Sequence, residues 1–288
     1  MTPRPHASLR SSAPNRASAA PLDGGPAPRG EAGARHEAEG HRRPAKAAFI
    51  AAALGGALLL PVTAAAQTGG WVSFNGATQA TATTFTNNVG FIEFHEDADF
   101  DADYAVGTGA VFDGGAGVRL ANGFGFGVAV SRFERLDPVS LDARIPHPFF
   151  FNRPRSLTGS EPDLTRLETA VHVEVRWYES VSDTVELAVF GGPTLFNVQQ
   201  DLVTAIGYDH AYPYDEASLA STTTAAASAS AIGFHAGADI GFFFSETVGL
   251  GALIRYSGGS VDLPGEGETM VPIDTGGFHI GGGLRLRF

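Results

Sequence analysis

The chain of 288 residues contains no cysteine, which excludes disulfide frameworks, thiol catalysis, Cys-ligated zinc and iron–sulfur clusters. It has a single lysine, Lys46, and a formal charge of −12, and this acidic balance argues against a nucleic-acid partner. From residue 67 onward it also lacks any apolar run of the roughly 18 residues that a spanning helix needs. The chain is 43% hydrophobic, so its apolar residues must lie in a folded core or on strands rather than in a membrane-spanning helix.

The first 66 residues have the parts of a secretory signal. Lys46 precedes the apolar stretch Ala47–Leu60, and Ala64 and Ala66 supply small residues at the −3 and −1 positions of a cleavage site. The sequence therefore predicts a leader and signal peptide over residues 1–66, with cleavage after Ala66 and a mature domain over residues 67–288. A membrane anchor is the alternative, but the apolar stretch is short for one.

The mature domain alternates between apolar and polar residues with a period of two, which is typical of strands with two different faces. In residues 167–178 one face is Leu167, Thr169, Val171, Val173, Val175 and Trp177, and every charged residue lies on the other face. Eight segments follow this rule: 88–95, 104–120, 124–133, 167–178, 185–196, 230–244, 248–256 and 278–288. Trp71 to Ala80 is ambiguous between a strand, a lead-in and a plug, so ten strands remain an alternative.

The connections between these segments alternate in length. Short turns are expected at 121–123, 179–184 and 245–247, and long loops at 96–103, 134–166, 197–229 and 257–273. All the short turns then fall at one end of an antiparallel meander. Short periplasmic turns and long extracellular loops are the pattern of a transmembrane barrel.

The faces decide between a membrane barrel and a soluble one. One face of most segments is almost wholly Val, Leu, Ile, Phe and Ala, and the opposite face carries charge and glycine. Such faces fit a tilted strand that crosses lipid, and Tyr104, Trp177 and Tyr256 are expected near the two interfaces. A periplasmic sandwich or lipocalin-like barrel would invert this arrangement and is the alternative. The sequence predicts an all-β fold, an eight-stranded antiparallel up-and-down transmembrane barrel.

The last segment ends with an alternating apolar face, and this face suggests a family. Its residues are Phe278, Ile280, Leu284, Leu286 and Phe288. This pattern resembles the C-terminal signal that outer-membrane barrels present to the barrel assembly machinery, and the chain is similar over residues 71–288 to small outer-membrane β-barrels of the OmpA-like transmembrane type. The resemblance implies a Gram-negative outer-membrane location, outer-membrane lipid and the assembly machinery as partners, and no particular activity.

Charges of both signs are expected inside the barrel. The candidate lumen network is Asp113, Glu168, His172, Glu174, Arg176, Glu186, His235, Asp239, Arg255, His279, Arg285 and Arg287. Eight strands leave room for little more than side chains, and buried charges must be paired. The favoured interpretation is a salt-bridged plug. A gated conduit or a proton-sensitive switch that uses the three histidines is the alternative.

The long loops supply the other candidate residues. The first loop spaces Asp97, Asp99, Asp101 and Asp103 by two, and it lacks the glycine and distal glutamate of a calcium loop, which favours a solvated acidic loop over a metal site. The second and third loops provide candidates for recognition: Phe149, Phe150, Phe151, Tyr208, Tyr212 and Tyr214. The alternatives for such aromatic residues are to cap the barrel, to join the outer aromatic girdle or to contact a partner, and local packing is the simpler interpretation.

Catalysis and cofactors are not expected, because no GxSxG elbow or HExxH pair occurs in the sequence. The predicted function is a structural, envelope-integrity or surface-recognition role with an extracellular partner of unknown identity. The alternative is a narrow channel or transporter of small solutes.

Overall fold

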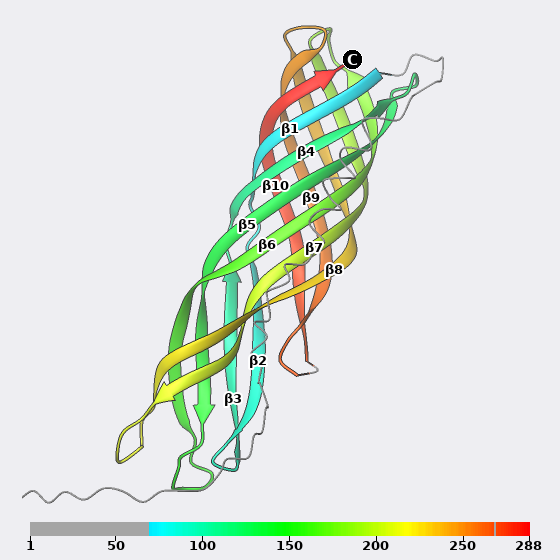
Figure 1. Cartoon of the computed structure of the whole chain (residues 1–288). Coiled ribbons are helices and arrows are strands. Elements are labelled where there is room, and N and C mark those ends of the chain that lie inside the picture. The colour runs from blue at the N-terminus through cyan, green and yellow to red at the C-terminus, as the bar shows by residue number, and fades with distance from the viewer. Residues whose placement is uncertain (1–68, 268) are drawn as a thin grey trace, which may run out of the picture. The chain divides into compact units, whose positions relative to one another are not determined.

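The computed structural model describes residues 69–267 and 269–288, and all of their regular structure is antiparallel β-sheet (Figure 1). The predicted leader, residues 1–66, lies outside the described residues. The strands are β1 (Gly69–Gln79), β2 (Thr83–Glu93), β3 (Glu96–Val106), β4 (Gly109–Arg119), β5 (Phe124–Ile145), β6 (Arg155–Ser180), β7 (Val185–Asp209), β8 (Ser218–Phe243), β9 (Val248–Pro264) and β10 (Met270–Arg287). Among these described residues no helix is long and apolar enough to span a membrane.

Eight of these strands form a closed ring. β1 pairs with both β4 and β10, and β5 pairs with β6, so the order β1-β10-β9-β8-β7-β6-β5-β4 returns to its start. β2 continues β1 after a break at residues 80–82, and β3 leads into β4 after a break at 107–108. The all-β, eight-stranded prediction is confirmed. The ambiguous Trp71 segment is a strand of the wall, with Trp71 opposite Arg287, and the ten separate segments still make a ring of eight.

The two ends of the ring differ in the length of their connections. Residues 120–123, 181–184 and 244–247 make short turns at one end, where β1 begins beside Phe288. At the other end the predicted long loops are wrong in extent. Most of residues 134–166, 197–229 and 257–273 is strand, and only 146–154, 210–217 and 265–269 connect strands there. The predicted loop 96–103 belongs to β3, which follows the two-residue turn Phe94–His95.

A belt of exposed apolar side chains surrounds the ring at its turn end. Its members include Phe74, Phe112, Phe126, Val128, Val173, Val175, Val189, Leu195, Ile232, Phe234, Ile240, Phe242, Leu250, Ile254 and Ile280. On β10 the outward apolar face spans the eleven residues Phe278–Phe288, about 36 Å of strand at ~3.3 Å per residue. At a tilt of about 45° this reaches ~25 Å, the height of the apolar band of an outer-membrane barrel. A belt of this size belongs in lipid, because monomers rarely expose so large a patch to water.

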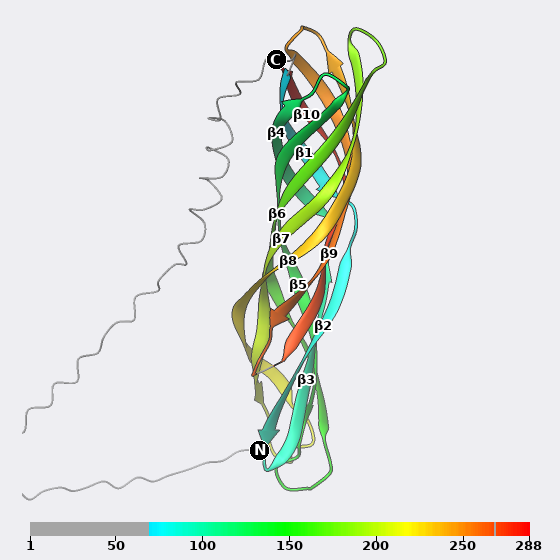
Figure 2. The same ribbon diagram turned by 90° about the vertical axis from the view of Figure 1, so that its right-hand side faces the viewer.

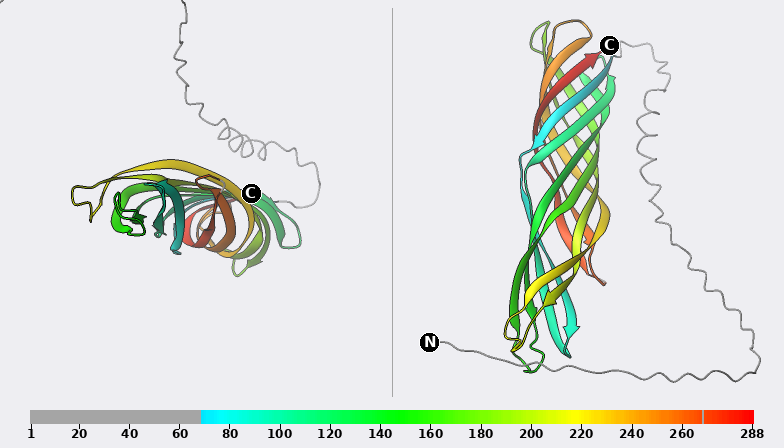
Figure 3. Two further views of the ribbon diagram at one scale, coloured as in Figure 1. Left: turned by 90° about the horizontal axis from the view of Figure 1, so that it is seen from below. Right: turned by 60° about the vertical axis from the view of Figure 1, so that its left-hand side comes forward.

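Beyond the belt the same strands reverse their polarity. On β5 the outer face continues from Val130 with the charged residues Arg132 and Glu134. Further along the strand, Leu141 is buried and Asp142 is exposed. The inward residues of this half form one hydrophobic core: Val89, Phe100, Ala102, Tyr104, Val139, Leu141, Ala143, Ile145, Leu157, Leu164, Val198, Leu202, Val203, Ala227, Val261, Leu263, Val271 and Ile273. This half is therefore packed like a water-soluble protein. We name it the extracellular half, after the side on which transmembrane barrels carry their long connections, and we name the half that carries the belt the membrane half. Figures 2 and 3 show the extracellular half as a long extension of the membrane half.

The acidic segment illustrates this reversal. Asp97 and Asp103 face outward on β3, and the intervening residues Ala98, Phe100 and Ala102 are buried in the core. The expectation of an acidic loop is corrected to an acidic outer face of a strand. Tyr104 is likewise not an interface residue. It is 3% exposed, its hydroxyl oxygen accepts a hydrogen bond of 2.8 Å from the Val203 N–H, and burial raises its pKa to about 12.

β9 and β10 end well short of the far ends of β5 to β8 (Figure 1). β8 pairs with β9 only over Phe234–Phe243, and within the described residues β2 pairs only with β3. The bend in β10 lies at Gly276 and Gly277, whose φ angles of 85° and 146° suit glycine. Because of this bend, Val261, Leu263, Val271 and Ile273 of the hairpin reach the hydrophobic core.

Candidate functional site

The structure places the candidate lumen network on the inner face of the ring. Eleven of its twelve members are buried: Asp113, Glu168, His172, Glu174, Arg176, Glu186, His235, Asp239, Arg255, His279 and Arg285. Arg287, at the turn end, is the exception, with a side chain that is 27% exposed. The network is divided into clusters, and three of them join strands that are not neighbours in the ring.

The middle cluster crosses the lumen between β4 and β9. Arg255 Nη1 donates to Asp113 Oδ2 at 2.8 Å, and Asp113 Oδ1 accepts a second hydrogen bond, also 2.8 Å, from Asn75 Nδ2. Arg255 Nη2 lies 3.3 Å from His279 Nδ1, and His279 Nε2 lies 3.1 Å from Gln79 Oε1. Asn75 and Gln79 are inward residues of the strand that sequence reasoning left ambiguous, so they were missed. Polar side chains therefore span the interior at this level.

A second buried cluster links four walls through hydroxyls and imidazoles. Ser131 Oγ lies 3.0 Å from His172 Nε2, and Thr194 Oγ1 lies 2.9 Å from both His172 Nδ1 and His235 Nδ1. A serine hydroxyl beside a histidine ring is the arrangement of a nucleophile and its general base. His172 is 0% exposed, so no substrate reaches it in this conformation. Among the residues described, no group of three or more His, Asp or Glu side chains is arranged to hold a metal ion.

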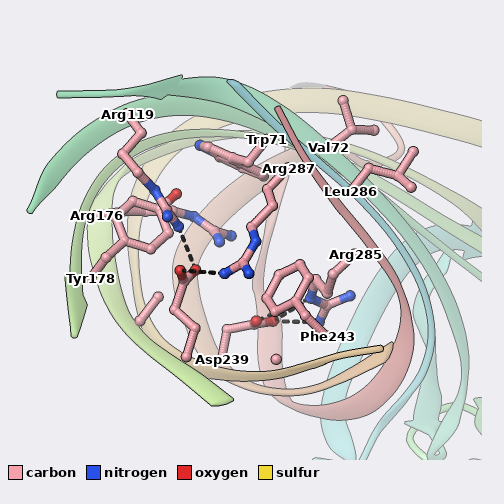
Figure 4. A pocket seen from close by; sticks show the side chains of 13 residues that line it. Trp71, Val72, Arg119, Arg176, Tyr178, Asp239, Phe243, Arg285, Leu286 and Arg287 are labelled. Carbon is pink, nitrogen blue, oxygen red and sulfur yellow. Dashed lines mark hydrogen bonds and ion pairs between the residues drawn. The ribbon is translucent and has the colours of Figure 1, made fainter. Parts of the chain in front are cut away.

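The turn end of the lumen is closed by arginines (Figure 4). Arg285 Nε lies 3.0 Å from Asp239 Oδ1, Glu186 pairs with Arg119, and Glu186 Oε2 lies 3.5 Å from Arg287 Nη1. The Arg176 guanidinium lies 3.9 Å from the ring centroid of Trp71. The cavity left between these side chains is about 20 Å³, room for about one water molecule.

The loop end of the lumen is closed by the β9–β10 hairpin. Glu168 Oε2 on β6 accepts hydrogen bonds from Thr275 Oγ1 at 2.6 Å and from the Gly276 N–H at 3.0 Å. Arg166, 1% exposed, donates from Nε to Glu168 Oε1 at 2.7 Å and from Nη2 to the Asp274 carbonyl at 2.8 Å. Arg166 was missed because it fell in a predicted loop. Because every second residue of this segment faces inward, the residue two positions before the predicted inward residue Glu168 identifies Arg166 as inward too.

At the far end of the extracellular half, loops that are distant in sequence meet. We call residues 93–97, 146–155 and 208–217 the tip. Arg155 is 5% exposed and donates from Nη2 to the Pro146 carbonyl at 2.9 Å and from Nη1 to the Tyr214 carbonyl at 3.1 Å. Arg153 Nη2 lies 3.0 Å from Asp215 Oδ1. These contacts join the β5–β6 loop to the β7–β8 loop.

The β2–β3 turn belongs to the same assembly. The Asn152 N–H donates to Glu96 Oε1 at 2.8 Å, and the Tyr208 hydroxyl donates to Glu93 Oε1 at 3.0 Å. Tyr208 lies at the end of β7 rather than in a loop. Burial, reinforced by Glu93, raises the pKa of Tyr208 to about 12. The tip is therefore held together by polar contacts from three connections.

The candidate aromatic residues of the tip remain largely exposed. Phe149, Phe150 and Phe151 are 69%, 53% and 75% exposed, and Tyr212 is 85% exposed. Phe149 makes an edge contact with Tyr214 at a centroid distance of 5.5 Å, and Phe150 lies 4.8 Å from the ring of buried His147. Phe149 and Phe150 thus contact neighbouring rings on one side and are open to solvent on the other. An open groove lined by residues 209–213 and 215–218 includes Tyr212.

The C-terminal apolar face comprises Phe278, Ile280, Leu284 and Leu286 on β10 and Phe288 directly after it. Its recognition by the assembly machinery stays a prediction.

No protein-family model and no curated protein matches the chain. Among solved structures it is similar to Neisserial surface protein A at 14% identity, covering 76% of this chain and 97% of that chain with a TM-score of 0.39. It is also similar to the outer membrane protein OprG from Pseudomonas aeruginosa (10% identity, 76% and 95% covered, TM-score 0.39). A third is Ail, the attachment invasion locus protein of Yersinia pestis (13% identity, 75% and 99% covered, TM-score 0.31). These neighbours are small outer-membrane β-barrels of the kind that the sequence resembles.

Proposed function

We propose that this outer-membrane β-barrel is a surface-recognition protein that presents its tip to an external partner. The observation that carries the proposal is the convergence of three connections into one assembly with exposed aromatic rings. Phe149, Phe151 and Tyr212 are more than two-thirds exposed, although buried Arg155 and the Arg153–Asp215 pair fix the loops that hold them. Fixed, exposed aromatic side chains bind with little loss of conformational entropy.

The extracellular half supports this role as a rigid stalk. Its hydrophobic core includes Leu141 at 3% exposure and Leu202 at 1%, and it continues from the top of the belt towards the tip. Binding residues are commonly carried on loops that a rigid scaffold positions. A barrel meant only to seal or brace the envelope would not require fourteen residues of β5, Arg132–Ile145, beyond the belt.

Transport through the lumen is not part of the proposal. The Arg255–Asp113 contact, the Glu168 contacts to β10 and the arginines of the turn end each cross the interior. An eight-stranded barrel has an interior that side chains fill. The proposal also includes no catalysis, because the exposed rings of the tip offer no nucleophile and the Ser131–His172 pair is enclosed.

The proposal places the protein in a Gram-negative outer membrane after cleavage near Ala66. The belt supplies the lipid contact. The barrel assembly machinery would recognise the apolar face of β10 that ends at Phe288. Deletion of Phe288 is expected to lower the amount of folded barrel in the outer membrane, read from the heat-modifiable gel shift.

The test uses cells that display the barrel on their surface. Retention of these cells is measured on immobilised extracellular proteins, glycans and phospholipid monolayers. The displayed protein is compared with a variant in which Phe149, Phe150 and Phe151 are replaced by serine. We expect retention on at least one surface and its loss in the triple variant. In planar bilayers we expect no steady conductance from the purified barrel.

The matched control is Leu136→Ser, which removes an apolar side chain of 57% exposure from β5, away from the tip. Equal retention of the triple variant and this control would refute recognition by the tip. Steady single-channel conductance by the folded monomer would favour the channel instead.

A further inference from the structure

The exposed phenylalanines of the tip offer a partner only apolar surface. Phe149, Phe150 and Phe151 are consecutive, stand between Pro148 and Pro154, and have no hydrogen-bonding atom in their side chains. They lie on a projecting turn between β5 and β6 rather than in a cavity. Small-molecule sites are concave, so a convex apolar turn fits a surface that deforms around it.

The lipid of the protein's own membrane does not reach these rings. Arg132–Ile145 of β5 stands between the belt and the tip, about 46 Å of strand at ~3.3 Å per residue. With a strand tilt of about 45° the tip is still ~30 Å above the belt. The phenylalanines therefore face another surface.

The charges of the tip indicate which surface that is. Acidic residues outnumber arginines, six to two: Glu93, Glu96, Asp97, Asp209, Asp215 and Glu216 against Arg153 and Arg155. This excess repels anionic lipid and attracts a cation. Quaternary ammonium groups bind to aromatic rings, and Tyr212, at 85% exposure, offers a free ring face beside these carboxylates. Arg153, whose side chain is 59% exposed and lies 5.4 Å from the Phe150 ring centroid, pairs with Asp215 through one amino group and has other N–H donors that can meet a phosphate.

We propose that the tip docks on a phosphatidylcholine bilayer of another cell or vesicle. Phe149–Phe151 enter the boundary between headgroups and acyl chains. The aromatic rings and carboxylates around Tyr212 and Asp215 contact choline cations, and Arg153 contacts lipid phosphate. This inference rests on the proposed recognition function and names its partner.

The experiment is vesicle flotation with the folded barrel in nanodiscs that contain no phosphatidylcholine. The nanodiscs are mixed with vesicles of pure phosphatidylcholine or of pure phosphatidylglycerol, and the bound fraction is measured against lipid concentration. We expect binding to phosphatidylcholine and at least tenfold weaker binding to phosphatidylglycerol. Burial of one phenylalanine is worth about tenfold or more in an equilibrium constant, so the triple serine variant should bind phosphatidylcholine more than tenfold more weakly.

Leu136→Ser is again the control and should bind like the unchanged protein, and the gel shift verifies that each variant is folded. Absent binding, equal binding to both vesicles, or unchanged binding by the triple variant would each overturn the lipid inference. If vesicle binding fails while the triple variant still loses retention on a protein or glycan surface, the recognition function stands and only its lipid partner is wrong. If the triple variant loses neither, both proposals fail.

Discussion

The buried pair of Arg255 and Asp113 gives the sharpest energetic test of the filled lumen. Arg255 is 1% exposed and Asp113 is 8% exposed, and the contact between them is 2.8 Å. Arg255→Met leaves a buried carboxylate with only the hydrogen bond from Asn75. Removing one partner of a buried pair costs about 3–5 kcal/mol. Asp113→Asn leaves the buried Arg255 guanidinium without its carboxylate partner, and it is expected to lower the free energy of unfolding by a similar amount.

The double variant should be much less destabilised than the sum of the two. With both charges gone, an amide beside Asn75 and an apolar side chain remain, and replacing a whole buried pair is often close to neutral. The loss in the double variant should fall below the sum of the two single losses by a coupling of at least ~3 kcal/mol, more than a hundredfold in the equilibrium constant.

The assay is reversible urea unfolding in lipid vesicles, followed by the fluorescence of Trp71 and Trp177 and by the gel shift. The control is Arg132→Met, which breaks the exposed Arg132–Glu134 pair, with side chains 57% and 61% exposed, and should cost about 0.5 kcal/mol or less. Additive losses in the double variant, or a loss at Arg255 no larger than that at Arg132, would refute a paired and desolvated lumen.

Three further expectations follow from the two halves of the barrel. Val173→Arg puts a charge on the lipid face and should cost ~2–4 kcal/mol in vesicles, while Ser140→Arg on the outer face of the extracellular half should cost almost nothing. Leu141→Ala should cost ~2–5 kcal/mol of core packing and make the extracellular half sensitive to protease while the membrane half stays protected. The raised pKa of Tyr104 means that its contribution to stability is complete below pH 10 and is lost as the pH rises through about 12, measurable by alkaline titration of tyrosinate absorbance. Tyr104→Phe should remove that loss while leaving the Val203 N–H without its partner, at ~1–3 kcal/mol.

Alternation was sufficient to predict the membrane half. Val171, Val173 and Val175 mark the outer face of β6, and the polar residues between them point inward as expected. The period fixes which residues share a face, and the charges fix which face avoids lipid. The N-terminal strand was harder, because the Asn, Gly and Thr residues of Gly69–Gln79 dilute the contrast between its faces.

The extracellular half was mistaken for loops because its polarity is reversed. In Val139–Ile145 the apolar residues alternate with Ser140, Asp142 and Arg144 as regularly as in the belt. This segment places its apolar residues on the face that carries charge in the membrane half, so one rule of polarity does not identify both halves of the same strand. In Ser218–Ala231 of β8 the signal itself is weak, because Ala, Ser and Thr differ little in hydropathy.

The joined tip could not be predicted from the sequence. Phe149 and Tyr214 are more than sixty residues apart, and their contact depends on the register of β5 with β6 and of β7 with β8. That register includes irregularities at Val203/Ala205 and Gly207/Tyr208, and a one-residue change would turn the strand residues that lead into the β7–β8 loop to the other face. The aromatic residues were recognisable as candidates, but their common location required the structure.

The reversal of polarity along the barrel is tested most directly by labelling single cysteines, because the natural chain has none. Cysteine is placed at Val173, Leu141 or Asp142, and intact cells are exposed to a membrane-impermeant maleimide. The structure predicts rapid labelling at position 142 and protection at 173 by lipid and at 141 by the extracellular core. Rapid labelling at 173, or labelling at 141 as fast as at 142 in the folded protein, would contradict it.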